Sequence, residues 1–150
     1  LKLNIHVSSL GRKLIFWGAV LFLIGLLQGV FIPLFLNPRM ALSAHLTAVQ
    51  SGMALMIFGL IWGLLSLGKK WLRVSYYSSI GGMYLIWLAI TLAAVLGASK
   101  ALPIAGKGFS STPIGEVAVE LIVYAGSGLC VLSAALIVVG LYRGLKNLGT

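Results

Sequence analysis

The stretch LIFWGAVLFLIGLLQGVFIPLFL, residues 14–36, decides the fold class of this chain. It carries no charged residue, and Gln28 is its main polar side chain. A helix rises about 1.5 Å per residue, so a stretch of this length can cross the ~30 Å hydrocarbon core of a bilayer. Because backbone polar groups in lipid must be satisfied within their own segment, the stretch is predicted to be a transmembrane helix.

Three more apolar stretches follow, at about residues 40–67, 74–98 and 113–141. Of the 150 residues, 60% are hydrophobic and 9% are charged. An average soluble domain is about 25% charged, so these polar side chains are too few to cover a soluble fold. The sequence therefore predicts an all-α integral membrane four-helix bundle, with residues 1–150 as a single transmembrane domain. It excludes a soluble enzyme, a disordered tail and a fibrous repeat.

Proline and its neighbours mark the predicted helix ends. Asn37-Pro38 and Thr112-Pro113 each fit an N-cap followed by proline at the first helical position. Pro33 is expected in the last turn of the first span, where it could kink the helix. A loop rich in Gly, Pro and Ser is expected between the third and fourth spans, over residues 99–112.

The basic residues predict the topology. Eleven Lys and Arg against two acids give a net charge of +9. The bases lie in short segments between apolar stretches, so we expect lipid contacts and topology signals, and no nucleic-acid partner. Eight belong to the side that holds both termini: Lys2, Arg12, Lys13, Lys69, Lys70, Arg73, Arg143 and Lys146. The other side has three: Arg39, Lys100 and Lys107. The positive-inside rule then puts both termini in the cytoplasm. We separately expect a bacterial or archaeal cytoplasmic membrane.

Small residues recur at four-residue spacing, which lets membrane helices approach closely. The pairs are Gly25 and Gly29, Gly59 and Gly63, and Gly140 and Gly144. They fit either close packing within one bundle or an interface between subunits. Four short helices enclose little space, so an oligomer with a shared site is a plausible expectation.

Polar residues inside membrane spans are costly, which makes them candidates for function. The candidates in the spans are Gln28, His45, Thr47, Gln50, Ser51, Tyr84, Thr91, Glu116, Glu120 and Ser127. By helical rise, Gln28, His45 and Thr91 each lie about 10–12 Å from the non-cytoplasmic end of their helix. We therefore expect one site, or one buried network, in that half of the bundle.

His45 is the only histidine within a span, since His6 lies in the basic N-terminal segment. Its imidazole could bind a metal or haem iron, or transfer a proton. Equally, it could simply hydrogen-bond a neighbouring helix. Apolar residues with a glycine gap share its helical face, an arrangement suited to a flat apolar ligand or to another helix: Leu42, Val49, Gly52, Met53 and Met56.

Glu116 and Glu120 are the only acids. Glu116 suits the first turn of a helix, where acids are favoured. Glu120 lies deeper and could pair with Arg39 or hydrogen-bond His45. The set matches no zinc, di-iron or EF-hand spacing.

The run FLNPRMALSAHL, residues 35–46, resembles hydroxylaminobenzene mutases. The similarity covers about residues 14–142 and continues through Gly52-Met53, Trp62, Tyr84, Trp87-Leu88-Ala89, Ala93-Ala94 and Pro103-Ile104-Ala105. It implies a small four-span isomerase that converts hydroxylaminoarenes to aminophenols by moving the hydroxyl from nitrogen to the ring.

That family is similar, more distantly, to styrene oxide isomerase. This enzyme is a trimeric membrane protein that holds haem b at subunit interfaces through a histidine, with the iron acting as a Lewis acid. The matching histidine here is His45, so the resemblance implies that His45 is an axial haem ligand and that the chain forms a homo-oligomer. Ser51 and Ile86 stand where the family usually has asparagine.

Three hypotheses remain. In the first, the chain is an isomerase of a small apolar substrate. His45 would be the catalytic residue or iron ligand, assisted by Glu120 or Arg39, and a pocket would be lined by Gln28, Tyr84, Thr91 and Ser51. In the second, it is a non-catalytic accessory subunit of a larger membrane complex. The third, a small transporter or channel, is disfavoured because the spans carry few charges and no inverted repeat.

Overall fold

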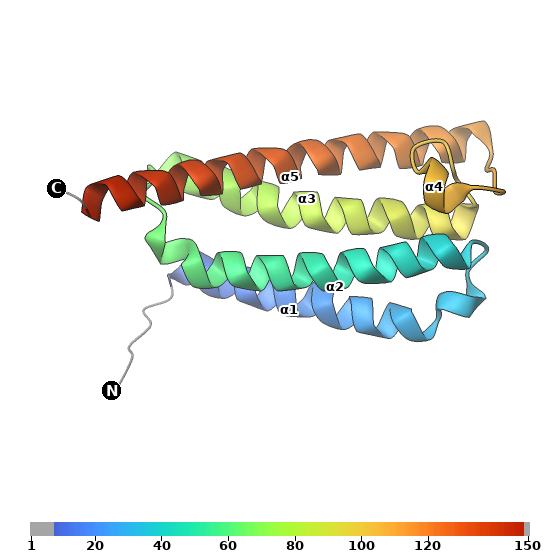
Figure 1. Cartoon of the computed structure of the whole chain (residues 1–150), viewed down its shortest axis with the longest axis horizontal. Helices are drawn as coiled ribbons and strands as arrows, with labels where there is room; N and C mark the ends of the chain where they lie inside the picture. The colour runs from blue at the N-terminus through green and yellow to red at the C-terminus, as the bar shows by residue number, and fades with distance from the viewer. Residues whose placement is uncertain (1–7, 149–150) are drawn as a thin grey trace.

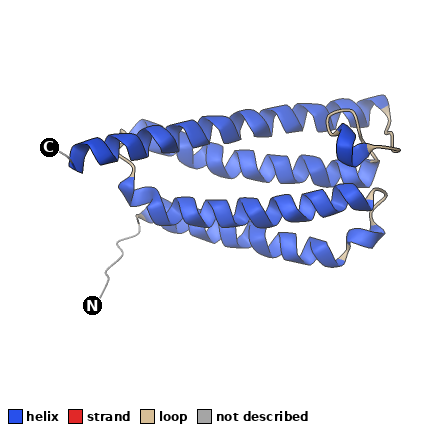
Figure 2. Ribbon diagram, in the orientation of Figure 1, coloured by secondary structure: helices blue, strands red, loops and turns tan. Residues whose placement is uncertain are grey.

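The structure is a computed structural model that describes residues 8–148, with side chains described for residues 8–146. Within that part of the chain every regular element is helical (Figures 1 and 2). The elements are α1 (Ser9–Val30), the 3-10 helix η1 (Ile32–Leu34), α2 (Pro38–Ile61), the 3-10 helix η2 (Trp62–Leu64), α3 (Lys69–Leu96), α4 (Pro103–Gly106) and α5 (Pro113–Leu148).

Four of these helices are long and apolar enough to cross a membrane: Ser9–Val30, Pro38–Leu64, Lys69–Leu96 and Pro113–Lys146. This confirms the predicted all-α bundle of four membrane helices. Large apolar side chains remain exposed along all four, as is expected of surfaces that face lipid.

The long helices form two antiparallel pairs, α1 with α2 and α3 with α5, joined mainly through α2 and α3. Figure 1 shows the start of α1 and the end of α5 at one end of the bundle, and α4 at the opposite end. We call these the terminal end and the α4 end.

Glycines bring α1 and α2 into backbone contact. A Cβ at Gly18 would lie 2.7 Å from the carbonyl oxygen of Gly52, and one at Gly59 would lie 2.5 Å from that of Gly11. Gly25 packs against Ala48 and Val49. Of the two expectations for the glycine pairs, close packing within one chain is therefore the observed one at these positions.

Gly63 is the exception among the predicted pairs, because a Cβ there would have no neighbour within 4 Å among the described residues. Gly140 and Gly144 pack against the segment that follows α2, at Leu65, Leu67 and the carbonyl of Leu64. Between α3 and α5, Gly82 lies against Cys130, and the buried hydroxyls of Ser79 and Ser133 hydrogen-bond each other.

The predicted N-caps of α2 and α5 are confirmed. The Asn37 side chain accepts a hydrogen bond from the Met40 amide at 3.1 Å, and the Thr112 hydroxyl accepts one from the Gly115 amide at 3.2 Å. Each cap precedes proline at the first helical position, as expected.

Several helix ends differ from the predicted spans, since α1 already begins at Ser9 and α5 continues to Leu148. The first helix does not continue to residue 36 with a kink at Pro33; α1 ends at Val30, and Pro33 lies in η1. Proline lacks the amide proton needed to bond the carbonyl of Gly29 and disfavours the α conformation at Ile32, so the helix stops before it. In α3, helical structure begins at Lys69, so the basic residues predicted to lie before the third span form its first turns.

Candidate functional site

His45 lies on α2, two turns from the start of that helix, and its ring contacts α1. Nδ1 is 2.7 Å from the carbonyl oxygen of Gly25. A Cβ at Gly29 would come within 2.9 Å of both Cε1 and Nδ1, so the ring fits only because residue 29 has no side chain. Glycines 25 and 29 of α1 therefore form the seat of the imidazole.

The hydrogen bond at Nδ1 fixes the state of the other ring nitrogen. A carbonyl oxygen can only accept, so Nδ1 carries the proton, and in the neutral ring Nε2 then keeps a free lone pair. Nε2 makes no hydrogen bond with any described residue, and the side chain is half-buried. His45 thus presents a fixed imidazole with one nitrogen available to a ligand or a proton.

The glycine gap predicted beside His45 holds a helix and not a ligand. A Cβ at Gly52 would lie 2.6 Å from the amide nitrogen of Phe22 and 2.7 Å from the carbonyl oxygen of Gly18. The backbone of α1 fills this part of the face. A flat ligand could reach only the neighbouring lipid-facing surface, where Leu42, Leu46 and Met53 are exposed.

Gln28 is the centre of a second polar cluster, between α1 and α3. It is 8% exposed. Its Nε2 donates to the Thr91 hydroxyl at 3.1 Å, and its Oε1 accepts from the Trp87 indole at 2.8 Å. The Thr91 hydroxyl donates in turn to the Trp87 carbonyl at 2.9 Å. The predicted association of Gln28 with Thr91 is present, and no sequence pattern indicated that Trp87 would complete it.

Tyr84 extends this cluster along α3. Its hydroxyl donates to the carbonyl oxygen of Trp17 at 2.8 Å, and its ring meets the rings of Trp17 and Trp87 edge-on, with centroids 6.4 Å apart in each case. These groups bind one another across the α1–α3 contact. The cluster shares α1 with the His45 seat, since Gln28 lies between Gly25 and Gly29, but no hydrogen bond joins it to His45 within the described residues.

Substitution of Gln28 by leucine should destabilise the bundle. It would leave the half-buried Trp87 indole without its acceptor, which costs about 1 kcal/mol or more. Denaturant unfolding in detergent micelles would measure the loss. Gln50→Leu, the same change at an exposed position of α2, should have an effect within about 0.5 kcal/mol. Equal effects of the two substitutions would contradict a structural role for the cluster.

The two acids bind the segment of residues 97–112, which lies at the α4 end. Glu116, in the first turn of α5 as expected, accepts hydrogen bonds from the amides of Ser99, Lys100 and Ser111 at 2.9–3.1 Å. Glu120 forms an ion pair with Lys100 at 2.9 Å, and this hydrogen bond raises the pKa of Lys100. The expected pairing of Glu120 with Arg39 or His45 was wrong, because a nearer cation in the 97–112 segment takes the carboxylate.

Arg39 also contacts that segment, donating to the carbonyl oxygen of Lys107. Asn37 does more than cap α2: its Nδ2 donates to the Ala105 carbonyl at 3.0 Å, and its backbone amide donates to the Ala94 carbonyl at 3.1 Å. Ser51 is half-buried on α2, and its hydroxyl bonds no described residue. The predicted site residues therefore fall into three groups: His45, the Gln28 cluster and the α4-end contacts.

An apolar cavity of about 440 Å³ opens between α2, α3 and the α4 segment. Its lining residues are Met40, Ser43, Ile90, Ala101, Leu102, Pro103, Ile104 and Ala105. His45 is not among them, because it faces the α1 side of α2. The cavity provides apolar space at the α4 end of the bundle.

The metal-ligating side chains of the described residues suit a cofactor held by one imidazole better than a metal ion held by several side chains. Within residues 8–148 no three His, Cys, Asp or Glu side chains come together. A haem needs only one protein nitrogen on its iron, and His45 offers one whose opposite nitrogen is oriented by a backbone carbonyl.

Four apolar membrane helices, one oriented imidazole among the described residues and a buried amide bonded to a half-buried indole define a small polytopic membrane protein with polar contacts between its helices. The chain belongs to the styrene oxide isomerase family, whose model matches residues 10–142.

Two curated relatives come from Ectopseudomonas oleovorans. Hydroxylaminobenzene mutase HabB is 41% identical over 141 residues, covering 89% of this chain and 86% of the relative. Hydroxylaminobenzene mutase HabA is 35% identical over 127 residues, covering 84% of this chain and 94% of the relative. These matches confirm the resemblance found in the sequence. No solved structure matches the chain significantly.

Proposed function

We propose that this chain is a membrane isomerase that moves a hydroxyl group from nitrogen to a ring carbon of an aromatic hydroxylamine, or rearranges a similar small apolar substrate. One observation carries the proposal: in a chain 41% identical to a hydroxylaminobenzene mutase, the single imidazole within a span is oriented with Nε2 free. The neighbouring surface is apolar, as a site for an arene requires.

The reaction gains and loses no atoms overall. The N–O bond breaks, a C–O bond forms on the ring, the ring carbon loses a proton and nitrogen gains one. Oxygen leaves nitrogen with the bonding electrons, so it must first be protonated or bound to a Lewis acid. In this proposal His45 supplies that assistance at Nε2, either by donating a proton from the imidazolium form or, as the neutral ring, by holding a cofactor. Haem iron on that nitrogen would supply Lewis acidity.

The other predicted site residues act mainly by position. The polar groups of Gln28, Thr91 and Tyr84 form hydrogen bonds with Trp87, with Trp17 and with each other. These bonds fix α1 against α3. Since Gly25 and Gly29 are on the same helix, this contact sets where His45 is held. Arg39 and Glu120 order the 97–112 segment. Ser51, whose hydroxyl bonds no described residue, lies on the same helix as His45 and is a candidate to contact substrate.

The test is to supply hydroxylaminobenzene to the purified protein in liposomes and to identify the product by mass and retention time. The proposal expects an aminophenol of unchanged mass, formed at a rate proportional to protein. If only the uncatalysed background is seen, with and without added haem, the accessory-subunit hypothesis replaces it.

We also propose that both termini face the cytoplasm, from the eight-to-three division of basic residues. The structure provides a test, because Gly68 and Lys107 are both exposed. Gly68 precedes the start of α3, at the terminal end, and Lys107 follows α4, at the opposite end. In a Cys130→Ala background, a cysteine at residue 68 should react with an impermeant maleimide only in inverted membrane vesicles. A cysteine at residue 107 should react only from outside. Labelling of residue 107 from the cytoplasm would contradict this topology.

An oligomer is part of the same proposal, a trimer by resemblance to styrene oxide isomerase. His45 is half-buried in one copy, so a second copy could close the apolar surface beside it. Mass measurement in mild detergent tests this: a strict monomer without any partner chain would contradict it.

A further inference from the structure

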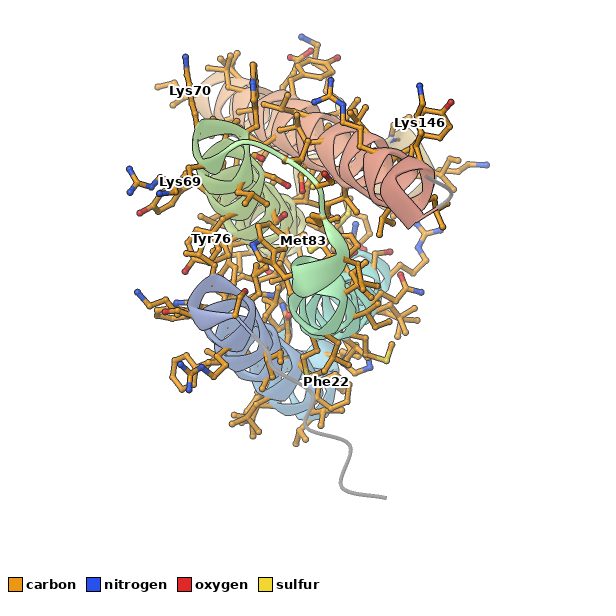
Figure 3. The ribbon with its side chains drawn as sticks, turned by 90° about the vertical axis from the view of Figure 1, so that its left-hand side faces the viewer. Phe22, Lys69, Lys70, Tyr76, Met83 and Lys146 are labelled. Carbon is orange, nitrogen blue, oxygen red and sulfur yellow. The ribbon has the colours of Figure 1, made fainter. Side chains whose placement is uncertain are left out.

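A groove of about 710 Å³ opens between α3 and α5 at the terminal end of the bundle. Three cations from the first turns of α3 line it, Lys69, Lys70 and Arg73. Its other walls are Val74, Tyr77 and Ser78 of α3 and Leu129 and Leu132 of α5. In Figure 3, Lys69 and Lys70 extend outward from α3, well apart from Lys146 on α5.

No acid of this chain neutralises the three cations. Glu116 and Glu120 are the only acidic side chains, and both are bound at the α4 end. The first turn of α3 contains no acid, and Gly68 provides no side-chain cap. Basic side chains at a helix N-terminus repel its positive dipole end, so this placement does not serve the helix itself. The three cations are therefore available to an anion from outside the chain.

The remainder of the groove indicates what carries the anion. A free inorganic anion gains no binding energy from apolar side chains. The groove nevertheless continues along the membrane-spanning part of both helices, lined by Val74, Leu129 and Leu132. Tyr77 is 70% exposed, and Trp71, beside Lys70, is 48% exposed. Such aromatic side chains mark the level of lipid headgroups. The groove therefore offers positive charge at headgroup depth and an apolar channel beneath it.

We propose that this groove binds one anionic phospholipid, with its phosphate among Lys69, Lys70 and Arg73 and an acyl chain along Leu129 and Leu132. The site is separate from His45 and does not depend on the proposed isomerase activity.

Native mass spectrometry of the protein released from mixed phosphatidylglycerol and phosphatidylcholine nanodiscs tests the proposal. The protein should retain phosphatidylglycerol in preference to phosphatidylcholine. Lys69→Gln, Lys70→Gln and Arg73→Gln combined should lower phosphatidylglycerol retention by about tenfold or more. The matched control removes three cations at the same end but outside the groove, as Arg12→Gln, Arg143→Gln and Lys146→Gln combined. It should retain the lipid.

A second variant leaves the charge unchanged. Leu129→Trp should obstruct the acyl channel and reduce retention, while inorganic phosphate at millimolar concentration should not displace the lipid. Equal loss in both triple variants would overturn the proposal in favour of diffuse surface attraction. Retention unaffected by Leu129→Trp together with displacement by phosphate would overturn it in favour of a simple anion site.

Discussion

Gly59→Leu should strongly destabilise the helical bundle. A Cβ at Gly59 would lie 2.5 Å from the Gly11 carbonyl oxygen and 3.0 Å from the Ile15 amide nitrogen, both backbone atoms of α1. Backbone cannot rotate aside as a flexible side chain can, so α1 and α2 would have to separate along their length. We expect a loss of about 3 kcal/mol or more.

Gly63→Leu is the matched control, because it makes the same substitution four residues away at a position with nothing within 4 Å among the described residues. It should fold with unfolding behaviour close to that of the unmodified chain. The measurement is unfolding by denaturant in micelles, followed by circular dichroism. If Gly59→Leu and Gly63→Leu unfold at the same denaturant concentration, the close α1–α2 contact is wrong.

Removal of the His45 imidazole should abolish the proposed isomerase activity. Loss of a general acid or base lowers rates by about 10²–10⁴-fold, and loss of a sole cofactor ligand should have an effect at least as large. His45→Ala keeps the small residues of α1 that pack against the ring, so the bundle should still fold. If haem is bound, the same variant should lose the Soret absorption band.

His6→Ala is the control for His45→Ala, since it removes the other histidine, which lies outside the described residues. It should keep both the activity and any Soret band. Loss of activity in both variants would indicate that the effect is not specific to His45.

The fold was predictable because a segment in lipid must satisfy its backbone hydrogen bonds internally, which restricts it to a helix. Each apolar stretch had to form a helix, and Asn37-Pro38 and Thr112-Pro113 mark helix starts by local hydrogen bonding that does not depend on tertiary structure. The end of α1 was misplaced because hydropathy continues unchanged through Pro33, while backbone geometry does not.

The candidate site was only partly predictable. Depth along a helix follows from sequence position, which is why Gln28 and Thr91 could be placed together before their bond was seen. Direction around the helix axis depends on how helices pair. The seat of His45 on Gly25 and Gly29, the indole of Trp87 and the capture of Glu120 by Lys100 all depend on that pairing. A single sequence carries no direct signal of how its helices pair.

The central claim is that the imidazole of residue 45 supplies the chemistry, and its most direct test is chemical rescue. His45→Gly removes the side chain at the Cβ and leaves space beside Gly25 and Gly29. The purified variant in liposomes would be given hydroxylaminobenzene with increasing free imidazole, and aminophenol formation would be measured. We expect no conversion without imidazole and a rate that rises with imidazole concentration. Wild-type conversion by His45→Gly in the absence of imidazole would contradict it.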